Sequence, residues 1–339
     1  MTLSVLSVAY PFAPVTADPA GGAEQVLAQL DRALVEAGHR STVIACEGSD
    51  VLGALTTVPA SPSAIDNERR AAVHAAVRDA IGRAGPHDLV HLHGVDFAAY
   101  LPGEGRTLVS LHLPLDWYPA DALRPGRRDL WLLPVSDSQA RRARPGAELL
   151  PPIGNGVDLG SYRPATRKRD HALVLGRIAP EKGFADALDA ARSADVDLIA
   201  AGPVFPYPEH ELYLEEQVRP RLDARRRWVG AVAGDEKRRL LAEARCLLVP
   251  STAPETSSLV AMEALASGTP VIAYRRGALP EVVEHGVTGF VVDDAAGMAD
   301  AIGRVGLIDP AACRRAAEAR FDVRRTAAAY LALYERLAA

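Results

Sequence analysis

The sequence predicts a two-domain α/β protein in which each domain has a largely parallel, doubly wound sheet. Three observations lead to this fold class. The chain has 339 residues, more than one hydrophobic core usually organises. Short apolar runs alternate with helical patterns along both halves. A Pro- and Gly-rich stretch at Pro145–Pro164 interrupts the alternation, which places a domain boundary there.

The first half alternates strands and helices from its beginning. Its apolar N-terminal run has no basic leader and soon reaches Pro11, so it predicts a strand rather than a signal peptide. The expected strands are Leu3–Tyr10, Ser41–Cys46, Asp88–His93, Thr107–His112 and Leu130–Val135, and the expected helices are Ala23–Ala37 and Asn67–Arg83.

The second half repeats the alternation after the Pro- and Gly-rich stretch. The expected strands are Ala172–Leu175, Asp197–Ala201, Arg227–Val229, Cys246–Val249 and Pro270–Tyr274. The expected helices are Asp186–Arg192, Gly234–Ala244, Leu259–Ser267 and Val323–Leu337.

Composition excludes several classes of protein. A net charge of -5 argues against a dedicated nucleic-acid binder, whose affinity depends on a basic surface. Cys46, Cys246 and Cys313 are odd in number and far apart, so they indicate neither a disulfide framework nor a zinc ribbon, and a reducing cytoplasm fits. No stretch approaches the roughly 20 apolar residues of a membrane span.

The segment from Pro250 to Val271 is the most informative one. It reads as the end of a strand, a polar loop, a helix and a further strand. Ser and Thr are good N-cap residues, so the helix is expected to begin around Thr256–Ser258, with unpaired N–H groups that form an anion site. Glu255 in the loop suits sugar hydroxyls and Glu263 in the helix suits a ribose diol, although a dipole-stabilising Glu and a surface Glu explain the same pattern.

A second polar loop follows the first strand of the second half. Gly176 ends this strand, and Arg177 and Lys182 follow within six residues. A planar guanidinium and a compact ammonium together can hold a diphosphate. Glu181 lies between them and offers the alternative of an ion pair in a solvated loop.

A glycine pair, Gly21-Gly22, lies between the first strand and its helix. Glycine lets the backbone approach a ligand closely, but the pair alone is a weak signal. No Gly-x-Gly-x-x-Gly opens this helix, which argues against an NAD enzyme.

Two spaced motifs resemble the signatures of the family-4 glycosyltransferases. They are Gly-Arg-Ile-x-x-Glu-Lys-Gly at 176–183 and Glu-x7-Glu at 255–263. Weaker similarity spans nearly the whole chain. It includes Gly21-Gly22, His112 at a strand end, Val135-Ser136, Asn155-Gly156-Val157-Asp158, Gly277–Val283 and Gly286–Val292.

The resemblance implies a GT-B fold of two facing Rossmann-like domains with a C-terminal crossover helix. The implied domains are an acceptor-side domain at 1–160, a nucleotide-sugar domain at 161–318, and a helix at 319–339 that packs back on the first domain. It also implies a retaining, metal-independent enzyme that takes a hexose-type sugar from a UDP- or GDP-linked donor, with no cofactor. The acceptor, a small molecule, glycan or lipid-linked compound, is left open.

The resemblance also implies roles for individual residues. Arg177 and Lys182 would contact the diphosphate, Glu255 the transferred sugar and Glu263 the ribose. His112 would lie near the reacting carbon. Gly21, Gly22, Gly176 and the backbone around Ser258, Leu259 and Val260 would line the diphosphate-sugar site. The sequence departs from the family at Thr256-Ser257-Ser258, where an aromatic-Gly pair is common, so hydroxyls stand in for bare backbone.

Several features have two interpretations. His91 and His93 resemble a weak metal pair or are structural, and Asp195-Val196-Asp197 leads into a strand, which disfavours a metal site. Trp117 and Tyr118 either stack on an acceptor or pack a loop. The basic stretch Arg124–Arg144 either contacts a membrane or phosphorylated acceptor, or is a solvated face. Alternative functions are a GT-B epimerase and a silent nucleotide-sugar-binding protein.

Overall fold

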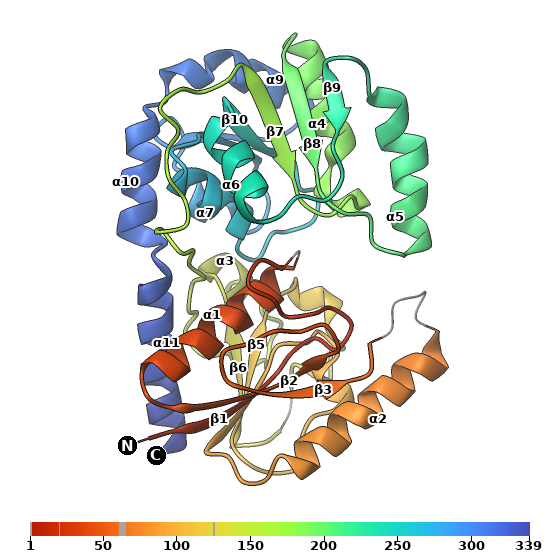
Figure 1. Ribbon diagram of the computed structural model, residues 1–339, viewed down its shortest axis with the longest axis vertical. Helices are drawn as coiled ribbons and strands as arrows, with labels where there is room; N and C mark the ends of the chain where they lie inside the picture. The colour runs from red at the N-terminus through yellow and green to blue at the C-terminus, as the bar shows by residue number, and fades with distance from the viewer. Residues whose placement is uncertain (1, 20, 61–65, 125) are drawn as a thin grey trace. The chain divides into compact units, whose positions relative to one another are not determined.

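The computed structural model describes residues 2–19, 21–60, 66–124 and 126–339 (Figure 1). Contacts within the chain divide it into two compact units, residues 1–155 with 324–339, and residues 156–323. The chain thus enters the second unit inside the Pro- and Gly-rich stretch and leaves it at Val323, the first residue of the last helix of the chain. The expected domain bounds, residues 160 and 318, lie close to these two crossing points.

The first unit contains a six-stranded parallel sheet in the order β3-β2-β1-β4-β5-β6 (Figure 1). The order reverses beside β1, which pairs with both β2 and β4. The strands are β1 Ser4–Val8, β2 Arg40–Cys46, β3 Ala54–Val58, β4 Leu89–Leu92, β5 Thr107–Leu111 and β6 Leu130–Pro134. The main helices are α1 Gly22–Glu36, α2 Asn67–Arg83, α3 Asp137–Ala140 and α11 Val323–Ala338.

The second unit repeats this topology with the order β12-β11-β10-β7-β8-β9. Its strands are β7 His171–Leu175, β8 Asp197–Ala201, β9 Arg226–Trp228, β10 Cys246–Val249, β11 Val271–Tyr274 and β12 Gly289–Val292. Its α-helices are α4 Phe184–Ser193, α5 Pro208–Tyr213, α6 Gly234–Glu243, α7 Leu259–Ala266, α8 Leu279–Val282, α9 Ala295–Arg304 and α10 Pro310–Arg320. The predicted fold class, two doubly wound α/β sheets, is confirmed.

The sequence-based assignment misses some elements for a physical reason. β3 is an edge strand whose side chains are mostly exposed, so it lacks the apolar run that marks a buried strand. With β3 included, His112 follows the fifth strand of the chain, whereas it ends the fourth of the predicted strands. β12, α9 and α10 also lie outside the predicted elements.

The last helix, α11, returns to the first unit and is attached there by buried polar contacts. The Tyr334 hydroxyl lies 2.8 Å from His91 Nδ1, and the Tyr330 hydroxyl lies 3.0 Å from Ser110 Oγ. The Thr326 hydroxyl donates to the carbonyl oxygen of Gly154 at 2.8 Å. His91 also bonds Ser110 through Nε2 at 2.9 Å, so one polar network joins β4, β5 and α11.

We expect Tyr334→Phe to reduce the free energy of unfolding by about 1–3 kcal/mol, because it leaves the buried His91 Nδ1 without its partner. Urea denaturation measures the change. Glu335→Gln, at an exposed position of the same helix, is the matched control and should stay within about 0.5 kcal/mol of wild type. Equal stability of the two variants would contradict the role given to this network.

Candidate functional site

Two polar loops meet at the carboxyl edge of the second sheet. One follows β7 and carries Arg177 and Lys182, and the other follows the neighbouring strand β10 and carries Glu255. The Thr252 amide donates to the carbonyl oxygen of Glu181 at 3.0 Å and joins the loops. In doubly wound sheets, ligands bind outside the carboxyl ends of the strands where the strand order reverses, and β7 and β10 flank that point here.

Glu255 is held by cationic and hydroxyl donors. Lys182 Nζ lies 2.6 Å from Glu255 Oε1, and Ser251 Oγ donates to the same oxygen at 2.5 Å. Burial raises the pKa of Glu255, but the charge of Lys182 and the hydrogen bonds from Lys182 and Ser251 outweigh it and hold that pKa below its usual range. The side chain is therefore an ionised hydrogen-bond acceptor at neutral pH. Ser251 was not among the predicted site residues.

Arg177 keeps most of its hydrogen-bonding capacity. Its guanidinium lies 5.2 Å from the centre of the Phe205 ring and makes a long 3.4 Å contact with Glu181. Its side chain is 28 % exposed, and that of Lys182 is 30 % exposed. The contact with Glu181 matches the alternative interpretation of this loop, but an arginine has five N–H donors, so one weak ion pair leaves the group able to bind an anion.

Two glycines fix the backbone beneath these side chains. Gly183 has φ +67°, and a β-carbon added there would lie 2.1 Å from the carbonyl oxygen of Pro250. Gly277 has φ +55°, and a β-carbon there would lie 2.1 Å from the carbonyl oxygen of Glu255. The neighbouring Ala278 amide donates to that same oxygen at 2.7 Å. The Gly277 segment therefore sets the position of Glu255.

Helix α7 begins at Leu259 after an unusual N-cap. The helix begins where expected, with Ser258 as its N-cap residue, but the Ser258 side chain does not make the capping hydrogen bond that a serine usually supplies there. Its φ of +71° and ψ of 70° place it in the left-handed region, where a serine hydroxyl does not make the usual cap contact. Leu259 and Val260 begin the helix, and the first N–H groups of a helix have no partner within it.

Glu263 lies deeper in α7 and is 1 % exposed. Lys237 on α6 donates to Glu263 Oε1 at 2.9 Å. The structure therefore separates the two glutamates of the Glu-x7-Glu motif, one in the loop beside Lys182 and one in the helix beside Lys237. The ribose contact expected of Glu263 stays a prediction, and Lys237 escaped the sequence analysis because its helix carries several charged residues of similar appearance.

The first unit holds the predicted residues His112, Gly21 and Gly22. His112 Nε2 lies 3.0 Å from His93 Nδ1, and the two rings stack with their planes 12° apart. Burial lowers the pKa of His112 to about 4, so the imidazole is neutral at pH 7. His91 bonds Ser110 and Tyr334 instead, which matches the structural interpretation of the His-x-His pair.

Gly21 and Gly22 begin helix α1. Gly21 is its N-cap residue, and a β-carbon there would lie 1.8 Å from Glu24 Oε2. This contact is with the flexible end of a side chain of the same helix, which can move, so it does not by itself require glycine at position 21. Gly176, after β7, donates its amide to the carbonyl oxygen of Ala201 at 3.1 Å.

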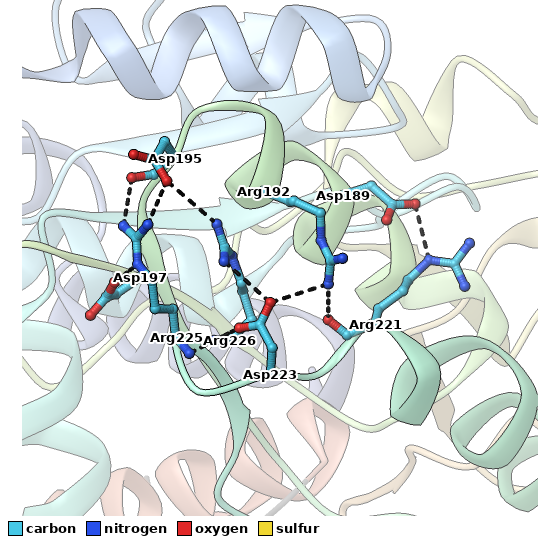
Figure 2. Close-up of polar contacts among 8 residues, drawn as sticks. All are labelled: Asp189, Arg192, Asp195, Asp197, Arg221, Asp223, Arg225 and Arg226. Atoms are coloured by element: carbon cyan, nitrogen blue, oxygen red, sulfur yellow. Dashed lines mark hydrogen bonds and ion pairs between the residues drawn. The ribbon is translucent and has the colours of Figure 1, made fainter.

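Asp195 and Asp197 belong to an ion-pair network (Figure 2). Arg225 contacts Asp195 and donates to Asp197 Oδ1 at 2.6 Å. The same surface includes pairs of Asp223 with Arg192 and Arg226, and of Asp189 with Arg221. Asp197 is the first residue of β8, so this network lies at the opposite end of the parallel sheet from the Arg177 and Glu255 loops. Within the described residues, no cluster of three or more His, Cys, Asp or Glu side chains could hold a metal ion.

The acceptor-side candidates divide between core and surface. Tyr118 is 5 % exposed and its hydroxyl accepts from the Leu113 amide at 3.2 Å, whereas Trp117 is 44 % exposed. In the basic stretch, Arg127 pairs with Asp129 at 2.9 Å and Arg124 donates to the carbonyl oxygen of Pro145 at 2.7 Å.

Among the described residues, no helix is both long and apolar enough to cross a bilayer.

The models of two protein families match different parts of the chain. The model of "Glycosyltransferase Family 4" matches residues 20–144, and that of "Glycosyl transferases group 1" matches residues 169–306. The chain is 28 % identical to the phosphatidyl-myo-inositol mannosyltransferase of Mycolicibacterium smegmatis, across 87 % of this chain and 83 % of that protein. It is 34 % identical to the D-inositol 3-phosphate glycosyltransferase of Corynebacterium efficiens, across only 42 % of this chain and 38 % of that protein.

Solved structures share the fold over nearly the whole chain. A glycosyltransferase involved in avilamycin A biosynthesis is 26 % identical, with a TM-score of 0.73 over 99 % of this chain and 98 % of that one. Sucrose-phosphate synthase from Thermosynechococcus elongatus is 22 % identical, with a TM-score of 0.80 over 98 % and 99 %. Anabaena HepE, crystallised with UDP and glucose, is 19 % identical, with a TM-score of 0.78 over 98 % and 100 %.

We expect Gly277→Ala to destabilise the protein more than Gly286→Ala. Both glycines have positive φ, which costs an alanine about 1–2 kcal/mol. Only at Gly277 does the added β-carbon also collide with the backbone of Glu255, whereas the space around Gly286 is open. Urea denaturation of both variants isolates the collision as the difference, and equal losses would contradict the supporting role of Gly277.

Proposed function

This chain belongs to glycosyltransferase family 4 and has the GT-B fold, and from that premise we propose that it transfers a hexose-type sugar from a UDP- or GDP-linked donor to an acceptor hydroxyl, with retention of anomeric configuration and without a metal ion. The observation that carries this proposal is the meeting of Arg177, Lys182 and an ionised Glu255 at the carboxyl edge of the second sheet.

The charges of this edge suit a nucleotide diphosphate sugar. When the bond between the anomeric carbon and the diphosphate oxygen breaks, negative charge develops on the diphosphate. Arg177, Lys182 and the N-terminus of α7 supply fixed positive charge and N–H donors to stabilise it. Glu255 accepts hydrogen bonds from hydroxyls of the transferred sugar. The binding of UDP and glucose by Anabaena HepE supports a nucleotide-sugar donor.

The acceptor hydroxyl attacks the anomeric carbon from the face that the diphosphate leaves, and a leaving phosphate oxygen takes its proton. For His112 the proposal keeps the role that the family resemblance implies, near the reacting carbon. Because the pKa of His112 is about 4, it acts as a neutral hydrogen-bonding group rather than as a cation. Its bond to His93 fixes the ring orientation.

The acceptor proposed first is an inositol-type polyol. Two relatives are named for inositol-containing substrates, the phosphatidyl-myo-inositol mannosyltransferase and the D-inositol 3-phosphate glycosyltransferase. Small molecules, glycans and other lipid-linked acceptors complete the panel. Epimerisation of the nucleotide sugar and binding without turnover are the alternative outcomes.

The test is a panel of nucleotides and nucleotide sugars, read first by thermal stabilisation of the protein and then by product analysis in EDTA. A ligand at 100 times its dissociation constant stabilises the native state by roughly 2.7 kcal/mol. We expect one of UDP or GDP to stabilise the protein and its hexose conjugate to yield a product with the anomeric configuration of the donor. An epimer formed without acceptor, binding without turnover, an inverted product, or loss of activity that only added metal restores would each contradict the proposal.

Arg177→Ala and Lys182→Ala should each lower kcat/KM by roughly 100-fold or more, because each leaves charge on the departing diphosphate under-compensated. Steady-state kinetics with the identified donor measures the loss. Arg167→Ala removes an exposed cation from the same unit and should retain wild-type activity. Near-wild-type kcat/KM in both site variants would refute the assignment.

A further inference from the structure

We infer that the hydroxyl groups of Ser257 and Ser258 donate hydrogen bonds to the distal end of the nucleotide sugar, its β-phosphate and the attached sugar. The inference rests on the proposed function and adds two specific contacts to it. In the family pattern this position commonly carries an aromatic-Gly pair, so the contacts would distinguish this chain from relatives with that pair.

The first observation is that both hydroxyls are buried without a partner. Ser257 is 6 % exposed and Ser258 is 8 % exposed, and neither Oγ has a hydrogen-bond partner among the residues that the structure describes. Buried polar atoms are nearly always hydrogen bonded, so two adjacent exceptions require an explanation. A ligand that supplies acceptor oxygens at this place would satisfy both.

The second observation is the backbone of Ser258. Among the described residues, only Asp195 and Ser258 have positive φ without being glycine. Asp195 is exposed and its carboxylate contacts Arg225, whereas Ser258 is buried and its side chain makes no capping bond. Glycine adopts this conformation without a steric cost, so a serine here carries strain that glycine would remove.

The surroundings indicate which part of the ligand lies there. Ser258 directly precedes the N-terminus of α7, where backbone N–H groups and the helix dipole favour a phosphate. Ser257 lies two residues after Glu255, the acceptor assigned to sugar hydroxyls. Hydroxyl donors between these groups match phosphate and sugar oxygens, which are abundant acceptors at that end of the donor.

The test compares Ser257→Ala, Ser258→Ala and Ser258→Gly with the exposed control Ser193→Ala. Calorimetric titration measures the affinity of each for UMP, UDP and UDP-glucose, or for GMP, GDP and GDP-mannose if guanine nucleotides stabilise the wild type. We expect each site variant to lose roughly tenfold in affinity for the nucleotide sugar, the size of one hydrogen bond to a charged group, with the monophosphate unaffected. Ser258→Gly should also raise the unfolding temperature of the ligand-free protein.

Which ligands lose affinity for the variants shows which part of the donor the two hydroxyls contact. A loss shared by the diphosphate and the nucleotide sugar assigns the hydroxyls to the phosphate, and a loss confined to the nucleotide sugar assigns them to the sugar; both support the inference. If the wild type binds the nucleotide sugar and all three site variants bind it with an affinity within twofold of the wild-type value, the inference is overturned and the proposed function stays intact. An equal loss for the monophosphate would overturn it as well, and absence of any nucleotide binding by the wild type would overturn both.

Discussion

The carboxylate of Glu255 must stay ionised at a place where much of its hydration is removed, and the loops of the second unit are arranged around that requirement. Lys182 supplies the countercharge from the loop after β7, and Ser251 donates from its own loop. Ala278 holds the Glu255 carbonyl from a third segment. Removing a partner from such a group is expensive because an uncompensated charge is left behind. Three segments far apart in sequence are thereby fixed at one edge of the sheet.

The ion pair between Lys182 and Glu255 joins two loops and also bears on the proposed reaction. An ammonium has three N–H groups, so the bond between Lys182 and Glu255 does not exhaust its donors. A diphosphate beside Lys182 would share that cation with Glu255 and draw on the guanidinium of Arg177. The donor sugar and its leaving group would then be held by one continuous set of charges, with the carboxylate on the sugar and the cations on the phosphate. The cations that keep Glu255 ionised are thus the ones assigned to the leaving group.

In the first unit, buried polar contacts attach helix α11 to the sheet. Tyr330 and Tyr334 of α11 are buried, and their hydroxyls form hydrogen bonds with Ser110 and His91 respectively. Burial strongly lowers the pKa of His91, so its neutral ring can both donate and accept within this network. His93 and His112 form a separate pair at the ends of β4 and β5. Three histidines close in space therefore have two distinct uses.

The sequence by itself determined the elements whose burial leaves a periodic apolar signal, including the strands Cys246–Val249 and Asp197–Ala201, and with them the fold class. It also determined the residue types of the candidate site, because two spaced motifs place cations and carboxylates after strand ends. Only the tertiary structure decided their partners. Glu255 pairs with a lysine 73 positions away, Glu263 with Lys237, and Asp195 and Asp197 with Arg225. It also gave Ser258 a left-handed backbone in place of a hydroxyl cap. The physical reason is that backbone propensity and apolar period act locally, whereas the countercharge of a buried group is chosen by whichever loop the sheet order brings to the same edge.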